Sequence, residues 1–385
     1  PVVRATAQYD AAAQLVNMKD WKRAIEVFEG YRRNWPNDAR AADVTRNLAV
    51  AYGEAGRPGD AAVEFERIAA APNEDAAVRR EALQSAADLY DKSGQPARAR
   101  VVLEKFVATY PDPVAPAIEA RQRLADIAAK QGEKDKQAFW QREIIRADAT
   151  AGAGRTDRTK VLAARAQLAL ATPTRDAFRA IRLAIPLKRS LAAKRKALEA
   201  ALAAYRKATD YGVAEVTTAS NFEMAELYRT LGKDVMTSER PKGLSRDERE
   251  QYDTLLEEQA FPFEEQSIEL HLVNAARVRE GVYDEWVRHS FEALGQLKPA
   301  RYGKTEAVQD VIATLDGSAP GARVQADFDR AVALVRAGKL TEAELEFSQL
   351  AAAAEGLAVP QANVGLLMRR SGDLAGAEQA LQAAV

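Results

Sequence analysis

The chain has 385 residues, of which 47% are hydrophobic and 29% are charged, a composition typical of a folded protein. Its 55 Lys+Arg and 56 Asp+Glu give a formal net charge of −1, which argues against a protein that binds polyanions over its whole surface. The absence of Cys excludes disulfides and thiolate chemistry, and two His are too few for the usual His-rich metal centres. No apolar run approaches the ~20 residues that cross a bilayer.

Helix-favouring residues dominate the composition: Ala is the commonest, Leu, Glu, Arg and Lys accompany it, and β-branched runs are scarce. We therefore expect an all-α protein. Several prolines stand between the periodic apolar stretches, where each is expected to end or separate helices. These prolines are Pro36, Pro72, Pro111, Pro173, Pro241, Pro262, Pro299, Pro320 and Pro360.

Three N-terminal segments, residues 9–36, 47–72 and 85–111, repeat one pattern. Each contains an apolar helical stretch, a turn, a small residue, a large apolar residue four positions later, and then Pro. The small residues are Ala24, Ala61 and Ala99, and the large residues are Phe28, Phe65 and Leu103. The repeated spacing predicts helical hairpins, with the small residue where two helices cross and the large residue filling the gap to the next hairpin.

The same small-to-large pattern returns near the C-terminal end, after Gly338 and Gly372, which are 34 residues apart. A further N-terminal copy is expected around residues 123–141, with its turn at Gly132. The pattern resembles the tetratricopeptide repeat, a helix–turn–helix unit of 34 residues. We expect a tetratricopeptide-type α-solenoid of stacked hairpins that turn at Lys19, Gly56, Gly94, Gly338 and Gly372.

The middle of the chain is less regular. Loop-forming residues around 149–157 and 316–322 divide the sequence into an N-terminal repeat array (1–150), a divergent hairpin section (151–316) and C-terminal repeats (317–385) that end inside a helical pattern. In the middle section, one apolar stripe is expected on the helix that begins near residue 187; it comprises Leu187, Leu191, Leu198, Leu202 and Tyr205.

Charge is segregated within this middle section. Residues 155–208 hold 14 Lys+Arg and 3 Asp+Glu, whereas residues 215–270 hold 6 Lys+Arg and 14 Asp+Glu. The basic segment has several interpretations: it pairs with the acidic helices that follow, it is a solvated face, or it binds an acidic protein, an acidic lipid or nucleic acid. Few aromatic residues accompany the cations, which disfavours nucleic-acid recognition.

No motif for catalysis or cofactor binding survives inspection. Gly303, Lys304 and Thr305 match only the end of a phosphate-binding loop, without its first Gly or a preceding strand. Glu285 and His289 are four residues apart, but no second motif joins them into a metal site. We therefore expect no catalytic residues, no metal and no cofactor, and we interpret the aromatic residues of the repeats as packing residues.

Solenoid repeats present a groove lined by the first helix of each hairpin. The repeat frame places charged and amide side chains there, which suits an extended peptide or helix that carries basic or amide groups. A second surface is expected on the basic helix, clear of its apolar stripe. The partner-binding residues predicted in this way are Arg46, Gln84, Asp88, Gln122 and Asp126 in the groove, and Lys188, Arg189, Arg195, Lys196, Arg206 and Lys207 on the basic helix.

Residues 187–306 are similar to a subgroup of bacterial tetratricopeptide proteins found beside TonB/ExbB/ExbD-type energy-transduction systems and gliding-motility machines. The resemblance implies a non-enzymatic protein–protein interaction scaffold in the periplasm or at the outer membrane, with envelope-complex subunits as partners. Because the first residue is Pro1, we expect that any signal or lipid anchor was removed. The alternatives are a helical accessory domain of a cell-wall enzyme and a nucleic-acid-binding helical array.

Overall fold

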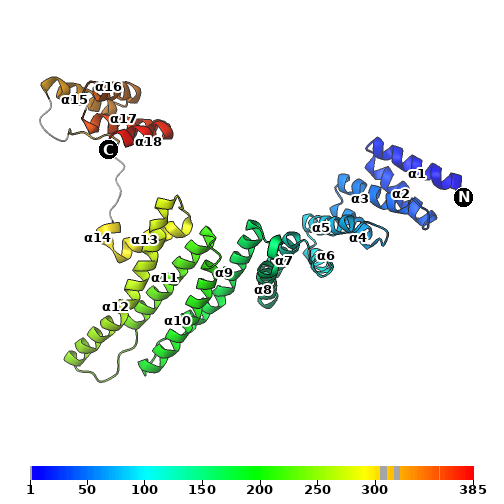
Figure 1. Cartoon of the computed structure of the whole chain (residues 1–385), viewed down its shortest axis with the longest axis horizontal. Helices are drawn as coiled ribbons and strands as arrows, with labels where there is room; N and C mark the ends of the chain where they lie inside the picture. Colours follow the sequence, from blue (N-terminus) through cyan, green and yellow to red (C-terminus); the bar gives the residue numbers. More distant parts are fainter. Residues whose placement is uncertain (1, 304–309, 316–320, 355) are drawn as a thin grey trace. The chain divides into compact units, whose positions relative to one another are not determined.

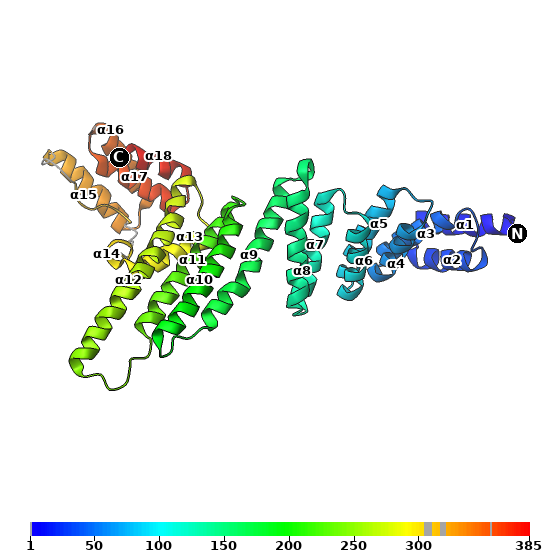
Figure 2. The same ribbon diagram turned by 60° about the horizontal axis from the view of Figure 1, so that its bottom comes forward.

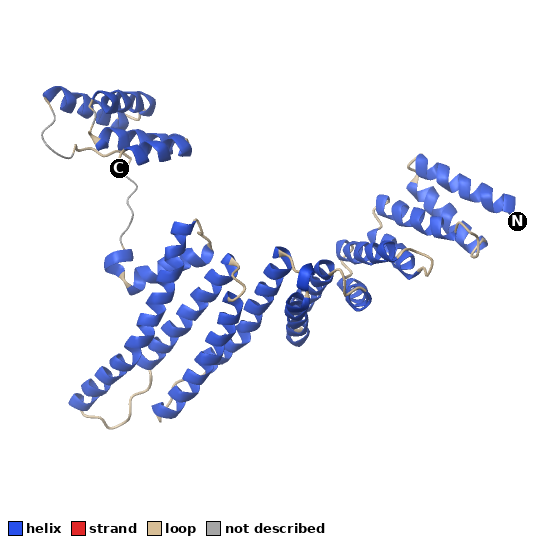
Figure 3. Ribbon diagram, viewed as in Figure 1, coloured by secondary structure: helices blue, strands red, loops and turns tan. Residues whose placement is uncertain are grey.

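The computed structural model describes residues 2–303, 310–315, 321–354 and 356–385, and every regular element in them is helical (Figures 1 and 3). No described residue lies in a strand. The chain divides into two compact units, residues 1–303 and 304–385. The division at 150 and 316 expected from the sequence stays a prediction, and the second of those boundaries lies outside the described residues.

The N-terminal part of the first unit is a series of helical hairpins. Their helices are α1 (Val2–Asn17), α2 (Trp21–Asn34), α3 (Ala41–Glu54), α4 (Pro58–Ala70), α5 (Ala76–Lys92), α6 (Pro96–Thr109), α7 (Val114–Lys130) and α8 (Lys134–Thr150). The hairpins turn at Lys19, Gly56, Gly94 and Gly132 as predicted, and all four residues have positive φ, from 57° to 72°. The left-handed conformation is less favourable at Lys19 than at the glycines, because the Cβ of a side chain clashes with the backbone in this conformation and glycine has no Cβ.

Each hairpin closes on the residues that the repeat pattern singled out. Ala24, Ala61 and Ala99 are fully buried where helices cross, so the predicted register of the repeats is confirmed. Phe28 and Leu103 are buried four residues further on, whereas Phe65 is only partly buried against the neighbouring core. Burial of these apolar side chains, at roughly 25 cal/mol per Å², is the main stabilising contribution.

Longer helices make up the rest of the first unit, where α9 to α12 lie side by side in both views (Figures 1 and 2). A short 3-10 turn, η1 (Gly152–Gly154), precedes them. The long helices are α9 (Asp157–Ala180), α10 (Leu187–Thr209), α11 (Ala214–Met236) and α12 (Arg246–Ala276). The 3-10 turn η2 (Arg277–Glu280) and the shorter helices α13 (Glu285–Leu297) and α14 (Pro299–Tyr302) follow them.

Two prolines do not end helices, contrary to the sequence-based expectation. Pro173 lies inside α9 and Pro262 lies inside α12. Both side chains are exposed, and the flanking residues keep the helix because their apolar side chains pack on the core of the middle section. Tertiary packing outweighs the missing backbone hydrogen bond at both positions. Of the two aromatics beside Pro262, Phe263 packs against this core, whereas Phe261 is 60% exposed.

The second unit contains two further hairpins: α15 (Ala322–Arg336) with α16 (Leu340–Ala353), and α17 (Ala358–Ser371) with α18 (Leu374–Ala383). They turn at Gly338 and Gly372, as predicted, and both glycines have positive φ. Ala343 and Phe347 are fully buried, and the core includes an edge-to-face pair of Phe328 and Phe347 with ring centroids 5.7 Å apart. The small-to-large pattern therefore has the same packing role here as in the N-terminal hairpins.

Candidate interaction surfaces

The first helices of successive hairpins are linked by arginine–carboxylate pairs, which we call the arginine ladder. Arg123 of α7 reaches back to Asp88 of α5 at 2.7 Å, and Arg158 of α9 pairs with Glu119 of α7 at 2.6 Å. The α9–α11 step is spanned by Arg165–Glu215 at 2.8 Å and Arg175–Glu223 at 2.7 Å. Most of these side chains are partly exposed, so each pair adds little stability by itself, about 0–1 kcal/mol.

The predicted groove residues lie on these first helices, and most of them already bind other side chains of this chain. Arg46 pairs with Asp43 at 2.9 Å and also with Glu74, while the Asp88 carboxylate binds Arg123. Gln122 donates to Asp126 at 2.8 Å, and Gln84 is half-buried without a side-chain hydrogen bond among the described residues. A peptide that binds to these side chains would compete with their intramolecular partners.

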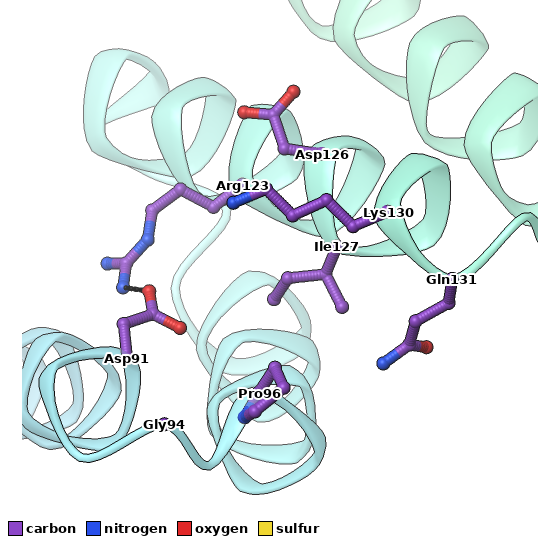
Figure 4. A pocket seen from close by; sticks show the side chains of 8 residues that line it. All are labelled: Asp91, Gly94, Pro96, Arg123, Asp126, Ile127, Lys130 and Gln131. Atoms are coloured by element: carbon purple, nitrogen blue, oxygen red, sulfur yellow. Dashed lines mark hydrogen bonds and ion pairs between the residues drawn. The ribbon is translucent and has the colours of Figure 1, made fainter.

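A surface pocket lies where the α5–α6 turn meets α7 (Figure 4). Arg123 crosses it to reach Asp91 at 2.5 Å, and Asp126 and Lys130 project from the same helix. Gly94 and Pro96 form the opposite wall. The pocket contains both charge signs already paired or side by side, so it offers a polar binding surface without a strong preference for either sign.

The outward side of α10 differs from the groove because its cations lack partners. Lys188, Arg189, Lys196, Arg206 and Lys207 are all exposed, and none of them forms an ion pair within the described chain. The sixth predicted residue, Arg195, donates to the Gln259 amide at 3.2 Å and lies over the Phe263 ring at 5.4 Å. The predicted apolar stripe faces the core, with Leu198, Leu202 and Tyr205 buried. We call the five unpaired residues the basic face.

Other cations of the same segment do pair internally. Arg165 and Arg175 bind Glu215 and Glu223 of α11, as described above. Lys194, which the sequence analysis did not single out, is 1% exposed and lies 2.6 Å from Asp234 of α11. These cations of residues 155–208 therefore fall into two groups. Those that face α11 form ion pairs within the protein, and those on the basic face do not among the described residues.

A second feature that sequence reasoning missed is the meeting of both histidines around Phe222 of α11. The centroids of the His271 and His289 rings each lie 5.6 Å from that of Phe222, and Trp286 lies 5.5 Å from it. Glu226, one turn along α11, is 3.4 Å from the fully buried His271. Burial alone would raise the pKa of Glu226, but contact with His271 and Arg229 lowers it, so the carboxylate stays ionised.

The sequence carried one signal for this cluster, since Phe222 and Glu226 are four residues apart and Trp286 and His289 are three apart, each pair on one helical face. Nothing in the sequence showed that the two faces meet. Within residues 2–303, 310–315, 321–354 and 356–385, no group of three or more metal-ligating side chains comes together, and no helix is long and apolar enough to span a membrane.

No protein-family model matches the chain, and no curated protein sequence matches it. Two solved structures are similar in their helical arrangement. A tetratricopeptide repeat protein from Parabacteroides merdae is 11% identical, with 94% of this chain and 98% of that chain covered and a TM-score of 0.29. The structure of Naa15/Naa10 bound to HypK-THB is 15% identical, with 97% of this chain and 52% of that chain covered and a TM-score of 0.31.

The helices, the positive-φ turns and the buried alanines support the fold assignment by themselves, and the predicted all-α solenoid of stacked hairpins is confirmed.

Proposed function

We propose that this protein is a non-enzymatic scaffold that binds protein partners, with the basic face of α10 as its main docking surface. The observation that supports the proposal is the contrast in pairing. Five exposed cations on one side of a 23-residue helix have no ion-pair partner among the described residues, while the neighbouring cations that face α11 do. At 1.5 Å per residue, Lys188 to Lys207 spans about 28 Å, which suits an extended acidic segment of a partner.

The chemistry of the basic face favours fast, salt-dependent association. Exposed cations raise the encounter rate with an acidic partner by long-range electrostatic attraction. Salt weakens this attraction, because the screening length is about 10 Å at 0.1 M ionic strength. The predicted groove residues Arg46, Asp88, Gln122 and Asp126 are a second surface in this proposal. Because their side chains are held by intramolecular partners, we expect them to contribute less to the association rate than the basic face does.

Charge reversal tests the basic face. The variant Lys188→Glu, Arg189→Glu and Lys196→Glu should weaken binding of a blocked decaglutamate peptide at least tenfold at 50 mM NaCl, measured by fluorescence anisotropy, with no change in melting temperature. The matched control reverses Lys22, Lys92 and Lys105, which lie on N-terminal hairpins, are also exposed and have no ion pair within the part of the chain that the structure describes. Equal loss in both triple variants would mean that overall charge, and not the basic face, decides binding. Unfolding of the test variant would mean that these cations support the fold.

The cell-envelope setting is a finer part of the proposal, supported by the similarity of residues 187–306 to the TonB-associated and gliding-motility subgroup. A periplasmic or outer-membrane location, with envelope-complex subunits as partners, predicts that the native protein is released into the osmotic-shock fluid or stays with the membrane fraction. Recovery in the cytosolic fraction would remove this part of the proposal and leave the scaffold function intact.

Two alternative functions give different results in the same binding assay. A nucleic-acid-binding array would bind a single-stranded oligonucleotide more tightly than decaglutamate, and its binding would weaken steeply with salt. An accessory domain of a cell-wall enzyme would bind isolated cell-wall polymer without depending on the basic face. Either outcome would replace the scaffold proposal.

A further inference from the structure

A surface pocket on the first unit lies between α11 and α13. Phe222, Glu226 and Arg229 line it from α11, and Trp286, His289 and Gln296 line it from α13. Phe222, Trp286 and His289 form one aromatic cluster, with ring centroids 5.5–6.0 Å apart, and all three rings are partly exposed. The Trp286–His289 contact is edge to face, at 77° between planes. The pocket therefore has an aromatic end and a polar end.

Partly buried polar contacts hold the two walls in place. Asp284 caps the start of α13 by accepting from the backbone N–H groups of Trp286 and Val287 at 3.1 and 2.9 Å, and its other oxygen accepts from Thr218 of α11 at 2.5 Å. Trp286 follows the cap by two residues, so its position is tied directly to α11. A rigid wall matters because binding then costs little conformational entropy.

Two donors in the pocket remain free, while the carboxylates of Glu226 and Glu292 are partly satisfied by neighbouring cations. The indole N–H of Trp286 has no acceptor among the described residues. The Gln296 carbonyl oxygen accepts from Arg229, so its amide NH₂ is left free. Arg288 lies 3.2 Å from Nε2 of His289, and because a guanidinium can only donate, Nε2 accepts and the ring proton is on Nδ1. The free indole N–H and amide NH₂ therefore favour a ligand that supplies acceptors.

Each carboxylate in the pocket already pairs with an arginine, which favours an uncharged ligand. Glu226 contacts Arg229 at 3.3 Å, and Glu292 pairs with Arg288 at 2.9 Å. Neither a cationic nor an anionic segment would find an unpaired opposite charge here. The only small apolar residue in the lining is the buried Ala293, so an aliphatic helix would find no deep hydrophobic slot.

We propose that this pocket binds an uncharged, proline-rich segment of a partner protein in an extended conformation. Proline offers a backbone carbonyl acceptor and no N–H donor, which complements a pocket with free donors, and its flat ring packs on aromatic side chains. The Trp286 indole N–H donates to a ligand carbonyl, while Phe222 and His289 contact the adjacent ring. This site deepens the proposed scaffold function but uses different residues from the basic face.

Binding of a blocked, fluorescein-labelled decaproline peptide to the full chain tests the proposal. Trp286→Phe keeps an aromatic ring and removes the donor, so we expect about three- to tenfold weaker binding, and Gln296→Leu should give a similar loss. The matched control is Trp140→Phe, another partly buried Trp that lies on α8 outside the pocket. Its affinity for decaproline should equal that of the parent protein.

Side-chain NMR provides a readout that a merely structural role of Trp286 would not move. The indole ¹⁵N–¹H resonance that disappears in Trp286→Phe should shift downfield when decaproline is added to the parent protein. The proposal is overturned if decaproline does not bind, if the indole resonance does not move, or if a blocked Ala–Lys peptide binds more tightly than decaproline. Decaglutamate binding through the basic face is independent of all three results, so failure here and failure of the scaffold proposal are distinguishable.

Discussion

The buried lysine of α10 allows a sharp test of how the middle section is held together. Lys194 Nζ lies 2.6 Å from Asp234 and 2.6 Å from the backbone carbonyl of Ile181, just after the end of α9, and 4.6 Å from the centre of the Phe178 ring. Lys194 is 1% exposed, whereas the Asp234 side chain is 33% exposed. The two ends of this ion pair therefore respond differently to losing their partner.

Asp234→Ala should be the more damaging change. It leaves an ammonium group buried with one carbonyl and one ring, and removing one partner of a buried pair costs about 3–5 kcal/mol of unfolding free energy. Lys194→Met keeps most of the apolar stem and leaves Asp234 to water, so the main loss is the Ile181 carbonyl bond, about 1–3 kcal/mol. The double variant should cost about as much as Lys194→Met alone, because no buried charge remains.

Urea unfolding followed by circular dichroism measures these costs, and hydrogen exchange in peptides from α9 to α11 shows whether the loss is local. The expected order of destabilisation is Asp234→Ala above Lys194→Met, with the double variant close to the latter. Our account of the pair is wrong if Asp234→Ala costs less than about 1 kcal/mol, or if Lys194→Met is the more damaging of the two. Either result would mean that water reaches the ammonium group.

Two further predictions concern the hairpins. Burial and the hydrogen bond to Glu66 raise the pKa of Tyr90 to about 12, above the ordinary value near 10, so its contribution to stability should be complete below about pH 10 and be lost as the pH rises towards 12. Tyr90→Phe should reduce the fall in the urea midpoint between pH 9 and pH 11, and an unchanged fall would contradict the assignment. Gly365→Ala should destabilise the second unit by about 1–3 kcal/mol, because a Cβ there would lie 2.7 Å from Leu381 Cγ and 3.1 Å from the Ala377 carbonyl oxygen. Gly53→Ala in α3, where the Cβ meets nothing within 4 Å, is the control and should be neutral or stabilising; equal effects at both sites would refute the close-packing argument.

The hairpin register could be predicted from sequence because small and large residues recur at fixed spacing. Ala61, Ala99 and Ala343 are fully buried for that reason, and Gly94 and Gly338 have the left-handed conformation that a tight turn requires. Such local patterns depend on residues that are close in the chain.

What the sequence could not predict depends on contacts between helices that are distant in the chain. The partner of Asp88 is Arg123, and Phe222 meets Trp286 across two helices. Pro262 was interpreted as a helix break because the local rule carries no information about the core that keeps α12 continuous. The exposed cations of α10 were predicted from their angles around the helix, but which cations pair with α11 became visible only in the structure.

The buried amides of the middle section have a consequence for how its helices can move. Asn221 of α11 donates to Asn274 of α12 at 3.2 Å, and Asn274 donates to the Thr218 carbonyl at 2.9 Å and to Ser290 of α13 at 3.1 Å. Apolar neighbours are indifferent to a slide of one helical turn, about 5.4 Å, because hydrophobic contact has no direction. The buried amides oppose such a slide, because each polar group that lost its hydrogen-bond partner would cost about 1–3 kcal/mol of stability. The three helices can therefore tilt against one another but remain locked in axial phase.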